Sequence, residues 1–288
     1  MKKLLNFTSK TDSHWVGDGF PVQTLFSYRD HNAQFSPFLL LDFAGPVDFE
    51  PSQHQRGVGQ HPHRGFETVT IVYEGEVAHR DSSGKGGVIG VGDVQWMTAG
   101  SGILHEEFHS EAFTKKGGRL QMIQLWVNLP AKDKMTSPHY QAIVKEKIPT
   151  VSLPENSGAL RIIAGDYEGQ KGAAKTFTPM DVWDVHIHQG KTVKLPLKEG
   201  RTTHLIAVKG LLRVNSETTL RQADVVTASA EGDSLSITAE EESTFLLLSG
   251  EPIKEEVVGY GPFVMNSQEE IKQAVRDFNS GHFGEIKN

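Results

Sequence analysis

Two short segments of the chain place histidine and glutamate side chains at alternate positions. The first is His61-Pro62-His63, and further along the chain His105 and Glu107 repeat the same spacing. Residues i and i+2 of an extended strand project from one face, so each pair can direct both of its side chains toward a single ion. A proline favours extended backbone at the residue before it, which suits the geometry of the first pair.

Three imidazoles and one carboxylate form a donor set that suits Fe(II), Mn(II), Ni(II) or Zn(II). If the two segments lie on neighbouring strands, all four groups meet, and an octahedral metal keeps two positions open for substrate, O₂ or both. A lone His-x-His often arises by chance and then marks no site. The second segment and the glycines that flank both segments favour a metal site, with His61, His63, His105 and Glu107 as its ligands.

Glu67 is a second candidate for the carboxylate ligand. It has the same parity as His61 and His63, but Gly65 lies between them and can break the strand. We therefore rank Glu107 first. Glu67 is then either an alternative ligand or a group that orients the ligands without binding the metal.

The composition excludes several other classes of protein. The chain has 288 residues, of which 37% are hydrophobic, and its net charge is −7 from 29 basic and 36 acidic residues. The absence of cysteine excludes disulfides, iron–sulfur clusters and thiol nucleophiles. The basic residues are scattered, so no nucleic-acid surface is expected. No apolar run approaches the roughly 18 residues of a membrane span, and Asn6 ends the apolar opening too early for a signal peptide, so we expect a cytoplasmic protein.

Short runs of β-branched and aromatic residues, each closed by Gly, Asp or Pro, dominate the rest of the pattern. They predict strands at 68–73, 88–91, 121–127 and 205–208. Strands spaced so closely, with turn residues between them, indicate antiparallel sandwiches or barrels.

Helical spacing is confined to the end of the chain. Ser267 precedes Glu270 at capping-box distance, and Gly281 ends the pattern. The apolar residues between them fall on one face and are Ile271, Ala274, Val275 and Phe278. We predict one short amphipathic helix that docks on the β body.

A weak internal repeat suggests two domains of similar build. The turn at Gly75 and the Gly-Asp that follows it are echoed by the turn at Gly210 and a later Ala-Asp. The polar stretch between Pro130 and Pro154 is the natural join. We expect one domain at 1–135 and a second at 136–288, which includes the helix.

Several long stretches resemble the pirin family of bicupins, and together they cover nearly the whole chain. They are residues 37–42, 61–70, 92–105, 250–253 and 260–267. The resemblance implies an all-β bicupin with two antiparallel β-sandwich (jelly-roll) domains. In that family the metal is held by residues that match His61, His63, His105 and Glu107, and the residue that matches Glu67 is not a ligand. A departure is Ser101, where the family has a longer, often basic residue.

The second half of the chain offers no equivalent ligand set. Aligning the two turns puts no plausible ligand at the positions of His61, His63 or His105. His186 and His188 form another His-x-His, but no His-x-Glu follows, and two histidines on a β surface are the more ordinary interpretation. We expect the second domain to be free of metal.

The resemblance implies a quercetin 2,3-dioxygenase-like enzyme, which opens the ring of a flavonol with O₂ and releases carbon monoxide. Its partners are then a small aromatic molecule and O₂, and we expect a monomer. Fe(II) is the expected metal, with Mn, Ni, Zn or Cu as alternatives, and Glu107 is the expected catalytic residue, with Glu67 as the alternative base.

Two other functions compete with this one. One is a regulatory pirin in which the metal shapes a surface that binds another protein. The other is a metal-dependent isomerase or hydrolase, because cupin sites serve many chemistries.

Overall fold

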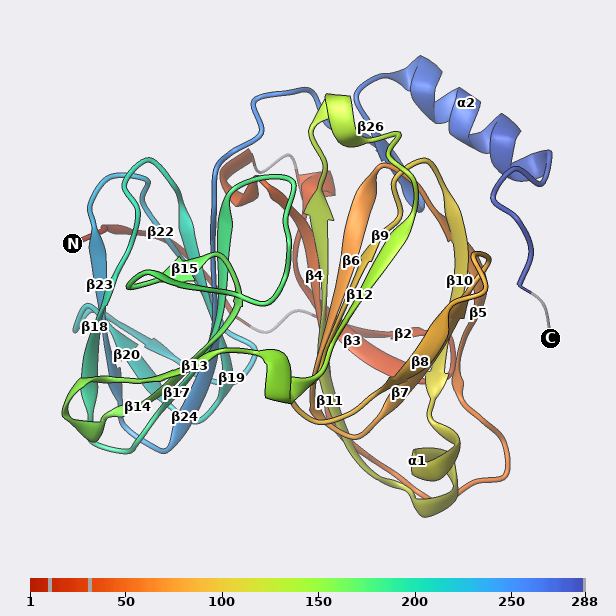
Figure 1. The fold of residues 1–288 in the computed structure, drawn as a ribbon. Helices are drawn as coiled ribbons and strands as arrows, with labels where there is room; N and C mark the ends of the chain where they lie inside the picture. The colour runs from red at the N-terminus through yellow and green to blue at the C-terminus, as the bar shows by residue number, and fades with distance from the viewer. Residues whose placement is uncertain (10–11, 31–32, 287–288) are drawn as a thin grey trace. The chain divides into compact units, whose positions relative to one another are not determined.

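The computed structural model describes residues 1–9, 12–30 and 33–286, and the chain forms two compact units (Figure 1). The N-unit groups residues 12–32, 37–145 and 253–288, and the C-unit groups residues 1–11, 33–36 and 146–252. This grouping differs from the expected division at 135/136, because both ends of the chain join the unit made by the opposite half. Such long-range pairing leaves no mark on local sequence patterns.

The N-unit contains two antiparallel sheets. Its strands are β2 (Ser13–Val16), β3 (Phe20–Ser27), β4 (Phe38–Phe49), β5 (Gly57–His63), β6 (Phe66–Glu74), β7 (Val77–Asp81), β8 (Gly86–Ile89), β9 (Val94–Thr98), β10 (Ile103–His109), β11 (Gly118–Asn128) and β12 (His139–Ile143). The larger sheet has seven strands in the order β12-β9-β6-β11-β4-β3-β2. The smaller has four, β5-β10-β7-β8, and it carries both predicted metal segments.

The C-unit repeats this arrangement of seven and four strands. Its strands are β1 (Leu4–Thr8), β13 (Thr150–Ser152), β14 (Gly158–Ala164), β17 (Met180–Ile187), β18 (Thr192–Pro196), β19 (Thr203–Lys209), β20 (Leu212–Val214), β21 (Thr218–Leu220), β22 (Val225–Ala228), β23 (Ser234–Ala239) and β24 (Ser243–Gly250), with a small hairpin of β15 (Asp166–Tyr167) and β16 (Gln170–Lys171). The orders are β1-β22-β19-β24-β17-β14-β13 and β18-β23-β20-β21. The repeated build confirms the predicted two-domain all-β fold.

Two α-helices belong to the N-unit. They are α1 (Glu111–Lys116) and the predicted terminal helix α2 (Gln268–Asn279), which follows the hairpin of β25 (Val258–Tyr260) and β26 (Phe263–Met265). Short 3₁₀ helices span 28–30, 33–35, 131–133, 145–147 and 154–156. None of the described helices is both long enough and apolar enough to span a membrane.

The terminal helix begins and docks as predicted. The Ser267 side chain accepts a hydrogen bond from the Glu270 backbone amide, which caps the first turn. Ile271 and Ala274 are buried against Phe263 of β26 and its neighbours. Phe278, expected on the same face, remains 37% exposed at the edge of this cluster.

The C-unit core contains a fully buried histidine, His204 of β19. The side chain is fully buried, its Nδ1 lies 3.0 Å from the Thr227 hydroxyl oxygen, and its ring lies 4.6 Å from the Phe35 ring. Burial lowers the pKa of His204 from 6.5 to about 3, although a hydrogen bond to the Gln34 backbone opposes the shift. The folded protein therefore holds this imidazole neutral at pH values where the unfolded chain protonates it.

This difference in pKa predicts acid sensitivity. Above about pH 6.5 both states are neutral at His204, and below it stability falls by about 1.4 kcal/mol per pH unit as the unfolded chain takes up the proton. His204→Gln should reduce the loss of unfolding free energy between pH 7 and pH 5 by about 2 kcal/mol. Urea unfolding of both proteins at the two pH values measures this, and an equal loss in parent and variant would contradict it.

Candidate metal centre

Strands β5 and β10 lie side by side and bring the two predicted segments together. Their antiparallel register sets His105 directly opposite His61, and Ile103 opposite His63. Directly opposite residues of an antiparallel pair point to the same face, so all three imidazoles lie on one face of the four-stranded sheet. The expectation that the two segments occupy neighbouring strands is confirmed.

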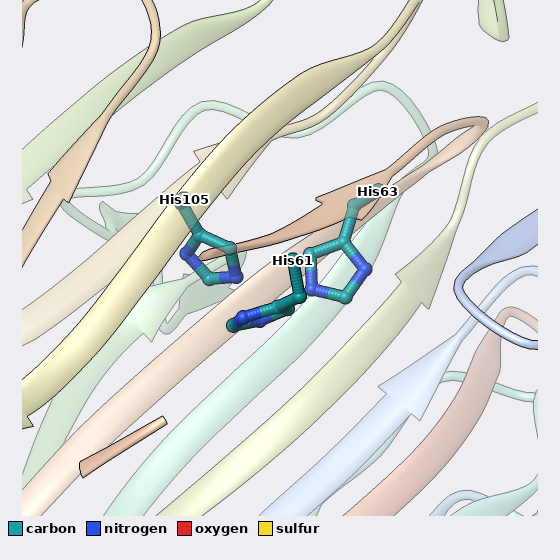
Figure 2. A group of neighbouring side chains, drawn as sticks. All are labelled: His61, His63 and His105. Carbon is teal, nitrogen blue, oxygen red and sulfur yellow. The ribbon is translucent and has the colours of Figure 1, made fainter. Parts of the chain in front are cut away.

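The three imidazoles converge on one another (Figure 2). One ring nitrogen from each of His61, His63 and His105 lies within 4.8 Å of the others. The ring centroids are 4.2 Å apart between His61 and His105, 4.8 Å between His63 and His105, and 4.9 Å between His61 and His63. Three nitrogens at such separations can all bind one ion after small side-chain rotations.

Two of the three imidazoles are buried without all the hydrogen-bond partners that such polar groups usually have. His105 is fully buried and His63 is 4% exposed. Among the described residues, both ring nitrogens of His105 and the Nδ1 of His63 have no hydrogen-bond partner. Burial also lowers the pKa of all three histidines, most strongly for His63 and His105. Neutral, unpartnered imidazoles are the form that binds a transition metal, so these residues fit one.

His61 is held in a defined tautomer. Its Nδ1 donates a hydrogen bond to the Gly59 carbonyl oxygen at 2.8 Å, which leaves Nε2 as the nitrogen with a free lone pair. His61 is also the partly exposed member of the trio, whereas His63 and His105 are buried.

Glu107 shares this face of the sheet but is not in the group of converging ligand atoms. A register shift follows His105, so that Glu107 lies opposite Val58 of β5. Its side chain is 6% exposed, and within the described part of the chain its Oε1 has no hydrogen-bond partner. Burial raises the pKa of Glu107 to about 7. A buried carboxylate oxygen without a partner, on the strand that carries His105, suits a ligand or a base.

Glu67 lies on β6, in the other sheet of the N-unit. Its Oε1 accepts a hydrogen bond from the Thr98 hydroxyl at 2.7 Å, across the β6–β9 pair. Its Oε2 is buried and has no partner in the described ranges, and burial raises the pKa of Glu67 to about 7. Glu67 is therefore anchored to a neighbouring strand by one oxygen and outside the histidine group.

The segment after His63 is tied to the end of the chain. Arg64 is 4% exposed and donates hydrogen bonds to the Ser101 carbonyl oxygen at 2.7 Å and to the Asp277 carboxylate of α2 at 2.8 Å. Its guanidinium also lies 4.8 Å from the centre of the Phe283 ring. The terminal helix thereby fixes the turn that ends the first ligand strand.

A buried lysine supports the same turn. Gly65 has φ +87°, and a Cβ there would lie 2.0 Å from the Val264 carbonyl oxygen, so only glycine fits. Lys134, 1% exposed, donates to the carbonyl oxygens of Gly65 and Val264 and to the Asn128 side chain, at 2.8 to 2.9 Å. Burial lowers the pKa of Lys134 to about 7.

Lys134→Met should lower the free energy of unfolding by about 3 to 5 kcal/mol, because three buried acceptors lose their donor. Lys132→Met, an exposed position two residues away, should change it by less than about 0.5 kcal/mol. Urea unfolding of the two variants provides the comparison. Similar values for both would show that the three hydrogen bonds contribute little.

His79 and Tyr140 form a pair beside Glu107 that local spacing does not reveal. His79 lies on β7 directly opposite Glu107, and its Nε2 is hydrogen-bonded to the Tyr140 hydroxyl, with the two rings stacked at 4.6 Å. Burial lowers the pKa of His79 to about 4, and burial together with the charge of Glu107 raises the pKa of Tyr140. Tyr140 comes from β12, and only the pairing of that strand with β9 brings it here.

Comparisons with known proteins agree with this fold. Residues 19–127 match the pirin family and residues 182–284 match the family described as Pirin C-terminal cupin domain. A Pseudomonas aeruginosa protein named "Putative quercetin 2,3-dioxygenase" is 55% identical over 98% of this chain and 99% of its own length. Human pirin is 36% identical over 89% of this chain and 86% of its own.

A solved structure gives the same result. The crystal structure of quercetin 2,3-dioxygenase from Acinetobacter baumannii matches with a TM-score of 0.96 and 53% identity, covering 100% of both chains. The two family matches, the two relatives and this structure all indicate the same family. The chain belongs to the pirin family.

Proposed function

We propose that His61, His63, His105 and Glu107 hold one divalent transition metal, Fe(II) in the native protein, and that the centre cleaves a flavonol-like substrate with O₂. The observation that carries the proposal is the convergence of three imidazoles, of which His63 and His105 have buried ring nitrogens without a hydrogen-bond partner among the described residues. Such a group is costly to bury in a protein that never binds an ion there. The names of the similar proteins from P. aeruginosa and A. baumannii support the choice of reaction.

Each residue has a distinct task in this proposal. The three histidines provide neutral nitrogen ligands, and the Gly59 carbonyl keeps His61 in the ligating tautomer. The metal, when bound, supplies a Lewis acid that lowers the pKa of a coordinated hydroxyl group and brings O₂ close to the substrate. Glu107 accepts the proton of the substrate's hydroxyl group through its unpartnered Oε1.

The walls of the centre suit a flat aromatic molecule. His63 contacts the rings of Phe66 and Trp126 at centroid distances of 5.1 and 5.4 Å, and those two rings lie 4.3 Å apart. Trp126 and His61 are both partly exposed, so an aromatic substrate that reaches His61 would have aromatic side chains of the centre as packing partners.

The test is oxygen uptake and carbon monoxide release with quercetin by the Fe(II)-reconstituted protein, run beside His63→Ala. We expect the parent to consume O₂ and release carbon monoxide, and the variant to do neither. His54→Ala, which removes an exposed histidine outside the trio, should behave as the parent.

The same experiment separates the alternatives. Oxygen uptake that persists in His63→Ala would show that the proposed centre does not carry the reaction. A parent that holds its metal but consumes no oxygen would contradict cleavage of quercetin. It would favour the regulatory function, in which the metal shapes a binding surface, a different substrate, or a metal-dependent isomerase or hydrolase that needs no O₂.

A further inference from the structure

A second group of metal-binding side chains lies in the C-unit. His186 is at the end of β17, His188 follows it, and Glu242 lies in the turn between β23 and β24. One ligand atom from each of the three lies within 4.8 Å of the others. Glu242 Oε1 is 2.6 Å from His186 Nε2 and 2.8 Å from His188 Nδ1, so both imidazoles converge on a single oxygen.

The two imidazoles have nearly the same mutual arrangement as the pair in the N-unit. The ring centroids of His186 and His188 are 5.2 Å apart at an interplanar angle of 85°. The corresponding values for His61 and His63 are 4.9 Å and 85°. The third member of this group is a carboxylate, whereas the third member of the N-unit group is His105.

The carboxylate is fixed in position and charged. Its Oε2 accepts a hydrogen bond from the Gln189 backbone amide at 3.0 Å, while Oε1 faces the two rings. The hydrogen bond from His188, followed by that from Gln189, lowers the pKa of Glu242 to about 2. His186 is oriented as well, because its Nδ1 lies 3.4 Å from the Thr244 hydroxyl oxygen and leaves Nε2 facing the carboxylate.

Nearby charged groups have other partners. Arg213 pairs with Glu240 at 2.7 Å, and Lys191 donates to the Glu155 carbonyl oxygen at 3.4 Å. Among the described residues, Glu242 forms ion pairs with the two imidazoles and with no lysine or arginine. A cation that displaced the imidazole protons would meet two nitrogens and one carboxylate already in place.

We propose that His186, His188 and Glu242 form a second site for a divalent transition metal such as Zn(II) or Ni(II). Two imidazoles and one carboxylate are a donor set for ions of this class. The side chains are 41 to 53% exposed, so water completes the coordination, and the ion exchanges more readily than one in the buried centre. The site revises the expectation of a metal-free second domain, and it is independent of the proposed dioxygenase function.

Zinc titration of the metal-free protein, without an affinity tag, tests this site by equilibrium dialysis and metal analysis. We expect about two zinc ions per parent chain, about one in His188→Ala or in His63→Ala, and none in the double variant. Glu242→Gln should lower the affinity for the second zinc ion by about tenfold or more. Circular dichroism checks the fold of each variant, and we expect the exposed substitutions to leave it intact.

His54→Ala is the matched control. His54 pairs with the Asp18 carboxylate at 2.9 Å on the surface, but it belongs to neither three-residue group, so both ions should remain. The proposal is wrong if the parent binds one ion that His63→Ala abolishes, or if His188→Ala binds as much zinc as the parent. The cluster would then be a hydrogen-bonded surface network.

Discussion

Replacing His105 with leucine should abolish metal binding at the buried centre while leaving the metal-free protein at least as stable as the parent. His105 is fully buried, and neither ring nitrogen has a hydrogen-bond partner among the described residues. Each such nitrogen costs about 1 to 3 kcal/mol in the metal-free fold, and leucine fills a similar volume without that cost. Metal affinity at this centre should fall by more than about a hundredfold, beyond what loss of a supporting group causes.

His109→Leu on the same strand is the matched control. His109 is also buried, but its Nε2 donates to the Gly19 carbonyl oxygen at 2.8 Å, and its ring packs among aromatic side chains. This variant should keep the metal and lose about 1 kcal/mol of stability, because the Gly19 carbonyl loses its donor. Metal content and urea unfolding of the metal-free proteins give both readouts. A large loss of stability in His105→Leu would instead assign His105 a structural function.

Local patterns predicted the histidine group because every step depended on strand geometry. The alternation of His61 and His63 about Pro62 required only an extended strand, which β5 provides. Placing His105 opposite His61 required two antiparallel neighbours, and the closely spaced strands indicated such a sheet. The structure therefore brings the three predicted histidines together, and their function as metal ligands stays a proposal.

The carboxylates were harder to predict because they depend on irregular and long-range structure. The register shift between His105 and Glu107 changes what Glu107 faces, and a bulge of this kind leaves no periodic signal. Glu242 contacts His186 and His188 from a turn more than fifty residues later in the chain. It lies in a run of three glutamates, a pattern that is typical of a solvent-exposed surface. A search limited to His-x-Glu spacing could not find it.

The ends of the chain show the same limit. The helix at 268–279 could be predicted from its capping residue and its apolar spacing. Nothing in its own residues indicated that it would join the N-unit. That placement depends on Arg64, whose ion pair with Asp277 spans 213 positions of the chain. The first strand likewise pairs with β22 of the opposite half.

Replacing Glu107 with glutamine should separate metal binding from turnover. The two side chains have the same shape, but an amide cannot accept the substrate's proton. We expect oxygen consumption with quercetin to fall by about 10² to 10⁴-fold, the usual contribution of a general base, while the three imidazoles retain the metal at reduced affinity.

Glu67→Gln is the control that shows whether the loss of turnover is specific to Glu107. Both carboxyl groups are almost completely buried, and burial raises the pKa of each to about 7, so neither burial nor charge distinguishes them. They differ in position, because Glu67 is hydrogen-bonded to Thr98 on the other sheet, whereas Glu107 shares strand β10 with His105. We expect Glu67→Gln to keep turnover within about tenfold of the parent. The opposite ranking of the two variants would make Glu67 the base, and it would leave Glu107 as a ligand whose charge the reaction does not need.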